Sequence, residues 1–174
     1  LDEPNFKPLD PAEAYMLMWQ VGSYVAYEDL YEEHASLMTD YCRDIVGRGK
    51  TITGADYNRA LRVVDVLKGQ FDDLFENYDL LLTPTMATQA FPVGHPPESI
   101  AGQSVDPHLS PLLFTFPINM IGHCAASIPC GVSRNGLPIG LQIIGRRLEE
   151  ATVLRASAAF ESARPWPSQP QLEG

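Results

Sequence analysis

The side chains that most often bind metals or act as bases in enzymes are widely scattered in this sequence. The four histidines, His34, His95, His108 and His123, form no His-x-His pair and no His-x-x-x-His pair. Metal-binding histidines usually recur at such short spacings, because one helix or strand then presents both rings to the same ion. The pattern therefore predicts no metal site, and we expect no cofactor.

Nucleophiles are equally isolated along the chain. The sequence contains no Gly-x-Ser-x-Gly elbow and no glycine-rich phosphate loop. Cys124 and Cys130 lie in apolar segments, where a thiol is usually an unreactive packing group. Lys68 falls outside the apolar stripe of a predicted helix, so its amine is expected to be solvated. These residues do not assemble a catalytic centre.

The composition fits a globular protein and argues against some partners. Hydrophobic residues make up 45% of the 174 residues, which is enough to build a core. There are 22 acidic residues against 12 basic ones, so direct binding to nucleic acid is not expected. The three cysteines form no Cys-x-x-Cys pair, which favours a reduced, cytoplasmic protein. No segment is long and apolar enough to cross a membrane.

The first part of the chain, residues 1–77, is predicted to be mainly helical. Asp10 and Pro11 suit the start of a first helix, which is expected to end at Gly22. A second helical stretch is expected over residues 24–45.

A third helix carries the clearest local signals. Thr53 suits its start, with Asp56 three residues later, and apolar residues then recur with helical period until Asn77. A short apolar strand is predicted over residues 79–83 and is closed by Pro84. A long helix followed closely by a buried strand is typical of an α/β sheet.

A long irregular segment follows at residues 84–110. It holds several prolines and two glycines and shows no hydrophobic period. A loop of this length is unusual in a compact domain unless it covers a site or an interface, and a solvated excursion without function is the alternative.

The last third of the chain is predicted to hold a short helix over residues 111–116, ended by Pro117, and then a β-hairpin over residues 125–144. Asn135-Gly136 marks the hairpin turn, because both residues readily take positive φ. A final helix is expected from near Leu148, and Arg146-Arg147 is interpreted as its solvated start.

The run of apolar residues at 139–144 lacks the alternation of a strand with one wet face. It indicates burial on both faces of a sheet. Gln142 inside this run must then be hydrogen-bonded, and bonding to neighbouring backbone is preferred over contact with a substrate.

Four segments follow each other with a specific spacing: DLLLTPT (79–85), TFPINMIGHCAASIPCG (115–131), GLPIGLQIIGRR (136–147) and LEEATVLRASAAFE (148–161). In order and spacing they resemble the C-terminal portion of an amidase signature family hydrolase. The matching residues are Asp79, Leu82, Thr83, Pro84, Thr85, Thr115, Pro117, Asn119, Gly122, Ala125, Ser127, Pro129, Gly131, Gly136, Leu137, Pro138, Gly140, Gln142, Gly145 and Glu161. One departure is Cys124, where the family usually has proline.

The resemblance implies an α/β fold in which a mixed β-sheet is wrapped by helices on both faces, only part of which this chain would form. Residues 1–174 would then be the C-terminal part of a single amidase domain. In that domain, residues 1–77 are mainly helical, and residues 78–166 contain strands, the long loop 84–110, the hairpin and the final helix.

The resemblance also implies a reaction, the hydrolysis of carboxamide C–N bonds by a Ser–cis-Ser–Lys triad. In the family the serines belong to a Gly/Ser-rich segment upstream of the blocks matched here, and the lysine lies further upstream. This chain contains no Gly-Gly and no Ser-Ser pair. We therefore expect the catalytic residues to lie outside this chain and the isolated chain to be inactive.

The remaining role for this chain is to position the substrate. The substrate-binding residues that we expect are Thr115, Phe116, Ile118, Asn119, Met120 and His123. Phe116, Ile118 and Met120 would line an apolar acyl pocket, and Asn119 would hold either a turn or the substrate amide. Phe91 and His95 are candidates to close over the entrance.

Three functions remain open at this point. The first is a portion of an amidase, with a small-molecule amide substrate and the missing N-terminal half as its partners. The second is a non-catalytic binding or scaffold fragment. The third is the A subunit of a tRNA-dependent amidotransferase, in which another subunit would hold the tRNA. No membrane partner is expected, and a homo-oligomer stays an open alternative.

Overall fold

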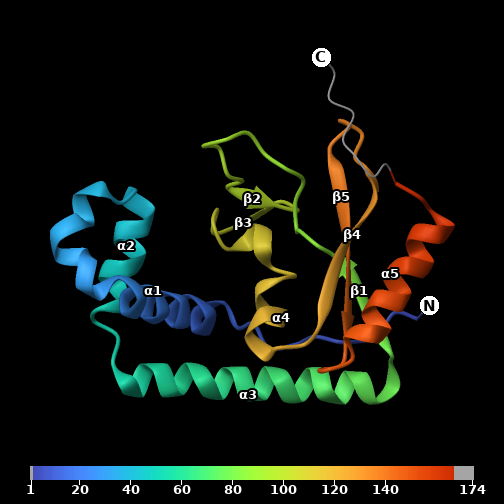
Figure 1. The fold of residues 1–174 in the computed structure, drawn as a ribbon, viewed down its shortest axis with the longest axis horizontal. Coiled ribbons are helices and arrows are strands. Elements are labelled where there is room, and N and C mark those ends of the chain that lie inside the picture. The colour runs from blue at the N-terminus through green and yellow to red at the C-terminus, as the bar shows by residue number, and fades with distance from the viewer. Residues whose placement is uncertain (1, 167–174) are drawn as a thin grey trace. The chain divides into compact units, whose positions relative to one another are not determined.

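The computed structural model describes residues 2–166. Over the described residues the chain forms two compact units, which divide between Phe71 and Asp72. The first unit is helical, and the second holds the sheets (Figure 1). The boundary between the units falls inside the long helix α3 (Gly54–Asn77).

The first unit contains α1 (Ala12–His34), the short 3-10 turn η1 (Ala35–Leu37) and α2 (Asp40–Gly49). α1 and α2 pack against each other. At Gly49, a Cβ atom would lie only 2.1 Å from the carbonyl oxygen of Gln20. Glycine at this position therefore allows the two helices to approach closely.

The predicted end of the first helix at Gly22 is wrong, because α1 continues to His34. A glycine inside a helix costs about 1 kcal/mol relative to alanine, which the packing of α1 against α2 can offset. The second stretch, predicted over residues 24–45, is correspondingly divided between α1 and α2. Asp10 nevertheless binds the first turn of α1, since its Oδ1 accepts a hydrogen bond from the Ala12 N–H at 3.0 Å.

The predicted start of α3 is confirmed. The Thr53 N–H donates to Asp56 Oδ2 at 3.1 Å, and the Asp56 N–H donates to Thr53 Oγ1 at 3.2 Å. The hydrogen bonds from the Thr53 side chain and backbone lower the pKa of Asp56, because they stabilise its ionised form. The helix ends at Asn77, as its apolar period indicated.

The main sheet of the second unit has three strands in the order β1 (Leu80–Pro84), β5 (Pro138–Gly145), β4 (Ala125–Val132), and both neighbouring pairs are antiparallel. Figure 1 shows α5 (Glu150–Ala163) on one side of this sheet and α4 (Phe116–Ile121) on the other. The α/β class with helices on both faces is thus confirmed. The burial expected for residues 139–144 holds for the second half of β5, where Gln142, Ile143 and Ile144 are buried, whereas Ile139 near its start is exposed.

The predicted hairpin is confirmed, but its turn differs from the prediction. The Ser133 N–H donates to the Leu137 carbonyl at 2.7 Å, and the Gly136 N–H donates to the Ser133 carbonyl at 3.0 Å. Gly136 has a φ of 77°, whereas Asn135 keeps a negative φ. The loop is therefore a turn followed by a single left-handed glycine, which is the usual form of a three-residue hairpin loop.

The predicted helix over residues 111–116 is wrong. The structure has a 3-10 turn, η2 (Ser110–Leu112), and then α4, which begins at Phe116. Pro117 lies in the first turn of α4 instead of ending a helix, because that turn does not need the N–H that proline lacks. The long loop also contains a small hairpin that the sequence analysis missed, β2 (Ser99–Ile100) with β3 (Gln103–Ser104).

Candidate functional site

Four polar side chains of the second unit share one face of the sheet. We call them the polar stripe: Thr83, Thr85, Ser127 and Gln142. Gln142 on β5 lies directly opposite Thr83 of β1 on one side and Ser127 of β4 on the other. Residues directly opposite each other on neighbouring strands point to the same face. The stripe therefore draws on three of the sequence motifs at once.

Gln142 ties this face together. Its side chain is 5% exposed, and its amide Nε2 donates to Thr83 Oγ1 at 3.0 Å and to the Phe114 carbonyl at 2.7 Å. A buried amide without such partners would destabilise the fold by about 1–3 kcal/mol. The expected hydrogen bonding of this amide is confirmed, with one backbone and one side-chain partner, and it joins β5 to β1 and to the segment before α4.

Thr85 and Ser127 form a hydroxyl pair at the more open end of the stripe. Their Oγ atoms lie 2.7 Å apart, and the Ser127 side chain is exposed. At Gly140, a Cβ atom would lie 2.6 Å from Thr85 Oγ1 and 2.9 Å from Ser127 Oγ. The absence of a side chain at Gly140 therefore leaves room for the pair, and its hydroxyls can bond a polar group of a ligand.

The residues expected to bind substrate fall into buried and accessible groups. Phe116 and Ile118 on α4 are 1% and 4% exposed, so both belong to the core of the described chain. Thr115 precedes α4, and its Oγ1 donates to the Leu112 carbonyl at 3.0 Å. Asn119 is exposed and Met120 is half-buried. The accessible side of α4 is therefore the one that carries Asn119 and Met120.

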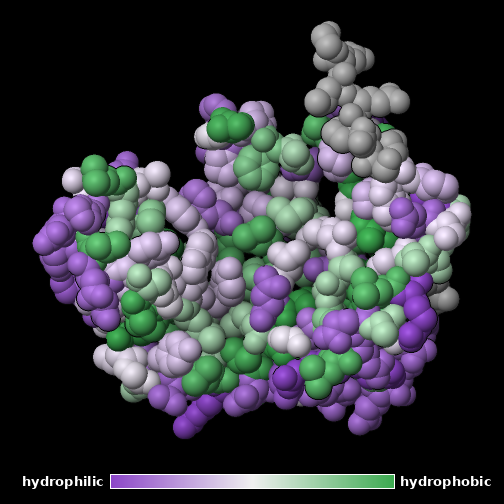
Figure 2. Space-filling model, viewed as in Figure 1, coloured by the Kyte–Doolittle hydropathy of each residue, from purple (hydrophilic) through white to green (hydrophobic). Residues whose placement is uncertain are grey.

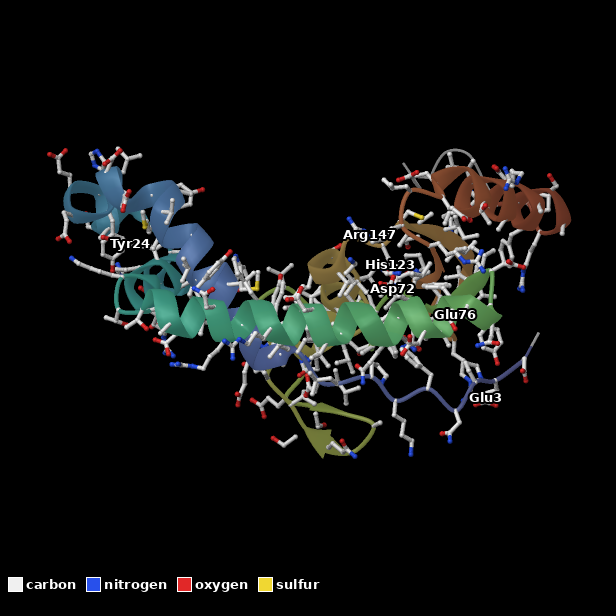
Figure 3. The ribbon with its side chains drawn as sticks, turned by 90° about the horizontal axis from the view of Figure 1, so that it is seen from below. Glu3, Tyr24, Asp72, Glu76, His123 and Arg147 are labelled. Carbon is white, nitrogen blue, oxygen red and sulfur yellow. The ribbon has the colours of Figure 1, made fainter. Side chains whose placement is uncertain are left out.

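His123, the sixth expected residue, is held against the end of α3. Its ring stacks on the Phe75 ring with centroids 5.2 Å apart and an angle of 21° between the planes. Its Nε2 lies 3.6 Å from Asp72 Oδ1, and Figure 3 shows the two side chains next to each other. With 1% of its side chain exposed, His123 holds the turn after α4 in place.

Arg146 has a structural role that the sequence analysis missed. Instead of being a solvated helix start, it donates to the Phe75 carbonyl from Nε at 2.9 Å and from a terminal nitrogen at 2.7 Å, and to the Tyr78 carbonyl at 3.1 Å. These bonds satisfy carbonyls at the end of α3 that have no partner within the helix. The available signal was that no capping glycine follows Asn77.

A hollow of about 840 Å³ opens in the second unit between the long loop and the start of β5. Figure 2 shows a gap in the surface near this part of the molecule. We call it the loop hollow, and residues 86–92, 99–101 and 138–140 line it. Phe91 is one of the lining residues, while His95 lies exposed in the same loop. The hollow shares Gly140 with the hydroxyl pair.

Residues 2–166 contain neither a metal-binding cluster nor a membrane-spanning helix. Over this range, no three or more His, Cys, Asp or Glu side chains gather closely enough to hold a metal ion. None of the described helices has both the length and the apolarity that a bilayer crossing requires.

Comparison with known proteins places this geometry in context. A family model called Amidase matches residues 4–154. An acylamidase of Rhodococcus erythropolis is 35% identical over 155 residues, which cover 86% of this chain and 32% of that protein. The glutamyl-tRNA(Gln) amidotransferase of Moorella thermoacetica has an A subunit that is 49% identical over 109 residues, covering 63% of this chain and 21% of its own length.

Solved structures agree with these sequence matches. A bacterial aryl acylamidase of the amidase signature family superposes with a TM-score of 0.78 at 29% identity, covering 90% of this chain and 34% of that one. A 6-aminohexanoate cyclic dimer hydrolase in complex with its substrate gives a TM-score of 0.76 at 26% identity. The chain thus spans between a fifth and a third of the length of the curated relatives named above.

Proposed function

Because the chain belongs to the amidase family, we propose that the whole protein hydrolyses the C–N bond of carboxamides and that this chain is its C-terminal portion. The observation that carries the proposal is the polar stripe. Its residues come from sequence motifs far apart in the chain, yet they meet on one face of one sheet. The exposed Ser127 at the end of the stripe, paired with Thr85, is where this face could meet a polar group of the substrate.

The proposed reaction takes place on groups outside this chain. A lysine relays protons through a second serine, the first serine attacks the amide carbonyl, and the tetrahedral intermediate expels the protonated amine. Water then attacks the acyl ester and releases the carboxylic acid and the free serine. The Ser–Ser–Lys triad is taken from the family resemblance.

This chain would act on the substrate in two ways. Asn119 and Met120, on the accessible side of α4, are proposed to contact the substrate directly. Phe116, Ile118 and His123 would hold α4 and its following turn from behind, since all three are buried. Small errors in the position of such a wall reduce the rate, because the reacting carbonyl must meet the nucleophile in one orientation.

A second candidate is the A subunit of a tRNA-dependent amidotransferase. It is favoured by the identity of 49% to the Moorella thermoacetica protein. In that case the substrate would be an amide that donates ammonia, and another subunit would hold the tRNA. We place either protein in the cytoplasm, in line with three free cysteines.

The proposal is tested by assaying the whole protein and the 174-residue chain on a panel of simple amides. The whole protein is expected to release amine from at least one member, and the chain alone is expected to release none. Asn119→Ala in the whole protein should lower kcat/KM without changing the midpoint of thermal unfolding, because this side chain is exposed.

The control is Arg155→Ala on the exposed side of α5, which should leave kcat/KM unchanged. Hydrolysis by the chain alone, or a whole protein that releases amine from no member of the panel, would contradict the proposal.

A further inference from the structure

We propose that Asn135 is a site of spontaneous deamidation and that the turn between β4 and β5 sets the rate of this modification. Asn135 and Gly136 lie between the end of β4 and the start of β5, at the tip of the hairpin (Figure 1). The inference is independent of the proposed amidase reaction, because it requires no substrate and no group outside this chain.

The residue that follows Asn135 is the first argument. Four other asparagines, Asn5, Asn58, Asn77 and Asn119, precede Phe, Arg, Tyr and Met, whereas Asn135 precedes glycine. A following side chain hinders the approach of its backbone nitrogen to the asparagine amide, and glycine removes that hindrance. Within the described structure, nothing lies within 4 Å of the position that a Cβ atom of Gly136 would take. The backbone at this peptide bond therefore has room to rearrange.

The accessibility of the side chain is the second argument. Asn135 is exposed, and its backbone N–H donates to Ser133 Oγ at 3.3 Å. Its side-chain amide has no hydrogen-bond partner among residues 2–166. No hydrogen bond within the described chain therefore holds this amide away from its own backbone, and water reaches the site.

The reaction needs only these two residues and water. The backbone nitrogen of Gly136 loses its proton to a solvent base and bonds to Cγ of Asn135, because the two atoms belong to neighbouring residues and can close a five-membered ring. The Cγ–Nδ2 bond breaks, and ammonia leaves with a proton taken from water. Water then opens the succinimide ring at one of its two carbonyls. The product is aspartate or isoaspartate, and no group is oxidised or reduced.

The folded turn restrains this reaction. The Gly136 N–H donates to the Ser133 carbonyl at 3.0 Å, and the Leu137 N–H donates to Ser133 Oγ at 3.2 Å. The attacking nitrogen is therefore engaged in the native hairpin, and the turn must open before it reaches Cγ of Asn135. Local opening at a loop tip costs less free energy than global unfolding. The rate of deamidation thus depends on how firmly Ser133 holds the turn.

The two products differ in their effect on the hairpin. Isoaspartate continues the chain through its former side-chain carboxyl, which adds a carbon to the backbone between Ser133 and Leu137. The Ser133 N–H donates to the Leu137 carbonyl at 2.7 Å across this segment, so the longer backbone disturbs the closing hydrogen bond. Aspartate adds a charge and leaves the backbone unchanged. Isoaspartate is therefore expected to loosen the start of β5, and aspartate is not.

The test incubates the whole protein at neutral pH and follows each asparagine by peptide mass spectrometry. Asn135 should deamidate at least about tenfold faster than Asn119, which is also exposed but precedes methionine. Ser133→Ala removes the hydroxyl that accepts two backbone N–H groups, so it should speed deamidation at Asn135 about threefold or more and leave Asn119 unaffected. Asn135→Gln is the matched control, and it should be nearly unreactive because its ring would need six members.

Concentrated urea provides a second measurement that does not depend on the folding of a variant. It should speed the reaction at Asn135 more than Ser133→Ala does, because it removes the turn altogether. Deamidation at Asn135 that is no faster than at Asn119 would overturn the assignment of the site. Equal rates at Asn135 in the native protein, in Ser133→Ala and in urea would show that the turn does not set the rate. The isolated isoaspartate form should also unfold at a lower temperature than Asn135→Asp, and equal midpoints would contradict the proposed effect on β5.

Discussion

The two faces of the three-stranded sheet are built from the same strands and differ in what they bury. On the α5 face, Ile128, Ile143 and Val153 form an apolar cluster, and partly buried residues such as Phe160 pack against it. On the α4 face, the polar stripe lies between the strands and the segment before α4. Side chains alternate along β5, so one strand supplies both faces. One face is closed by apolar packing, and the other carries polar side chains, of which Gln142 is buried and Ser127 is exposed.

The largest effect is expected on the α5 face. Ile143→Ala removes a side chain that is 2% exposed and leaves a cavity beside Val153, so the free energy of unfolding should fall by about 2–5 kcal/mol. Urea unfolding of the chain measures this. Leu154→Ala, at a position that is 64% exposed on α5, is the matched control and should change stability by about 0.5 kcal/mol or less. Equal losses in the two variants would mean that the α5 face is not a packed core.

A smaller loss is expected at the buried amide of the opposite face. Gln142→Leu keeps the size of the side chain but leaves the Phe114 carbonyl without its donor, which should cost about 1–3 kcal/mol in the free energy of unfolding. Gln142→Glu should be at least as destabilising at neutral pH, because an ionised carboxylate cannot donate a hydrogen bond. Urea midpoints of the two variants give the comparison. If Gln142→Leu left the urea midpoint unchanged, packing alone would hold this face.

The smallest effect on stability is expected at the hydroxyl pair. Ser127→Ala removes one partner of the bond to Thr85 at a solvent-accessible position, and the loss should be about 0.5–1.5 kcal/mol. In the whole protein, the same change is expected to raise KM for an amide substrate. Converted to free energy, this rise should exceed the loss in the free energy of unfolding. A double-mutant cycle with Thr85→Val measures the coupling between the two hydroxyls. If Ser127→Ala lowered stability as much as Ile143→Ala and left KM unchanged, the two faces would not differ in role.

Several local signals were ambiguous, and one depended on a tertiary contact. Pro117 was interpreted as the end of a helix and instead lies in the first turn of α4, because proline is compatible with both positions and sequence alone does not distinguish them. Gly22 was interpreted as a helix end for a similar reason, since a glycine lowers helix stability without forbidding the helix. Arg146 was expected in solvent, because its carbonyl partner on Phe75 is distant in the sequence.

The sequence by itself determined those features whose partners lie within one turn or one hairpin. Thr53 and Asp56 specify the start of α3, and Gly136 specifies the β4–β5 turn, because each acts through groups a few residues away. The motifs also identified the family. Only the tertiary structure decided that Gln142 bonds Thr83 and the Phe114 carbonyl, and that the long loop borders an open hollow without charged lining residues beside β5. Such features depend on strand register and loop path, which arise from packing of the whole sheet and are encoded in no single segment.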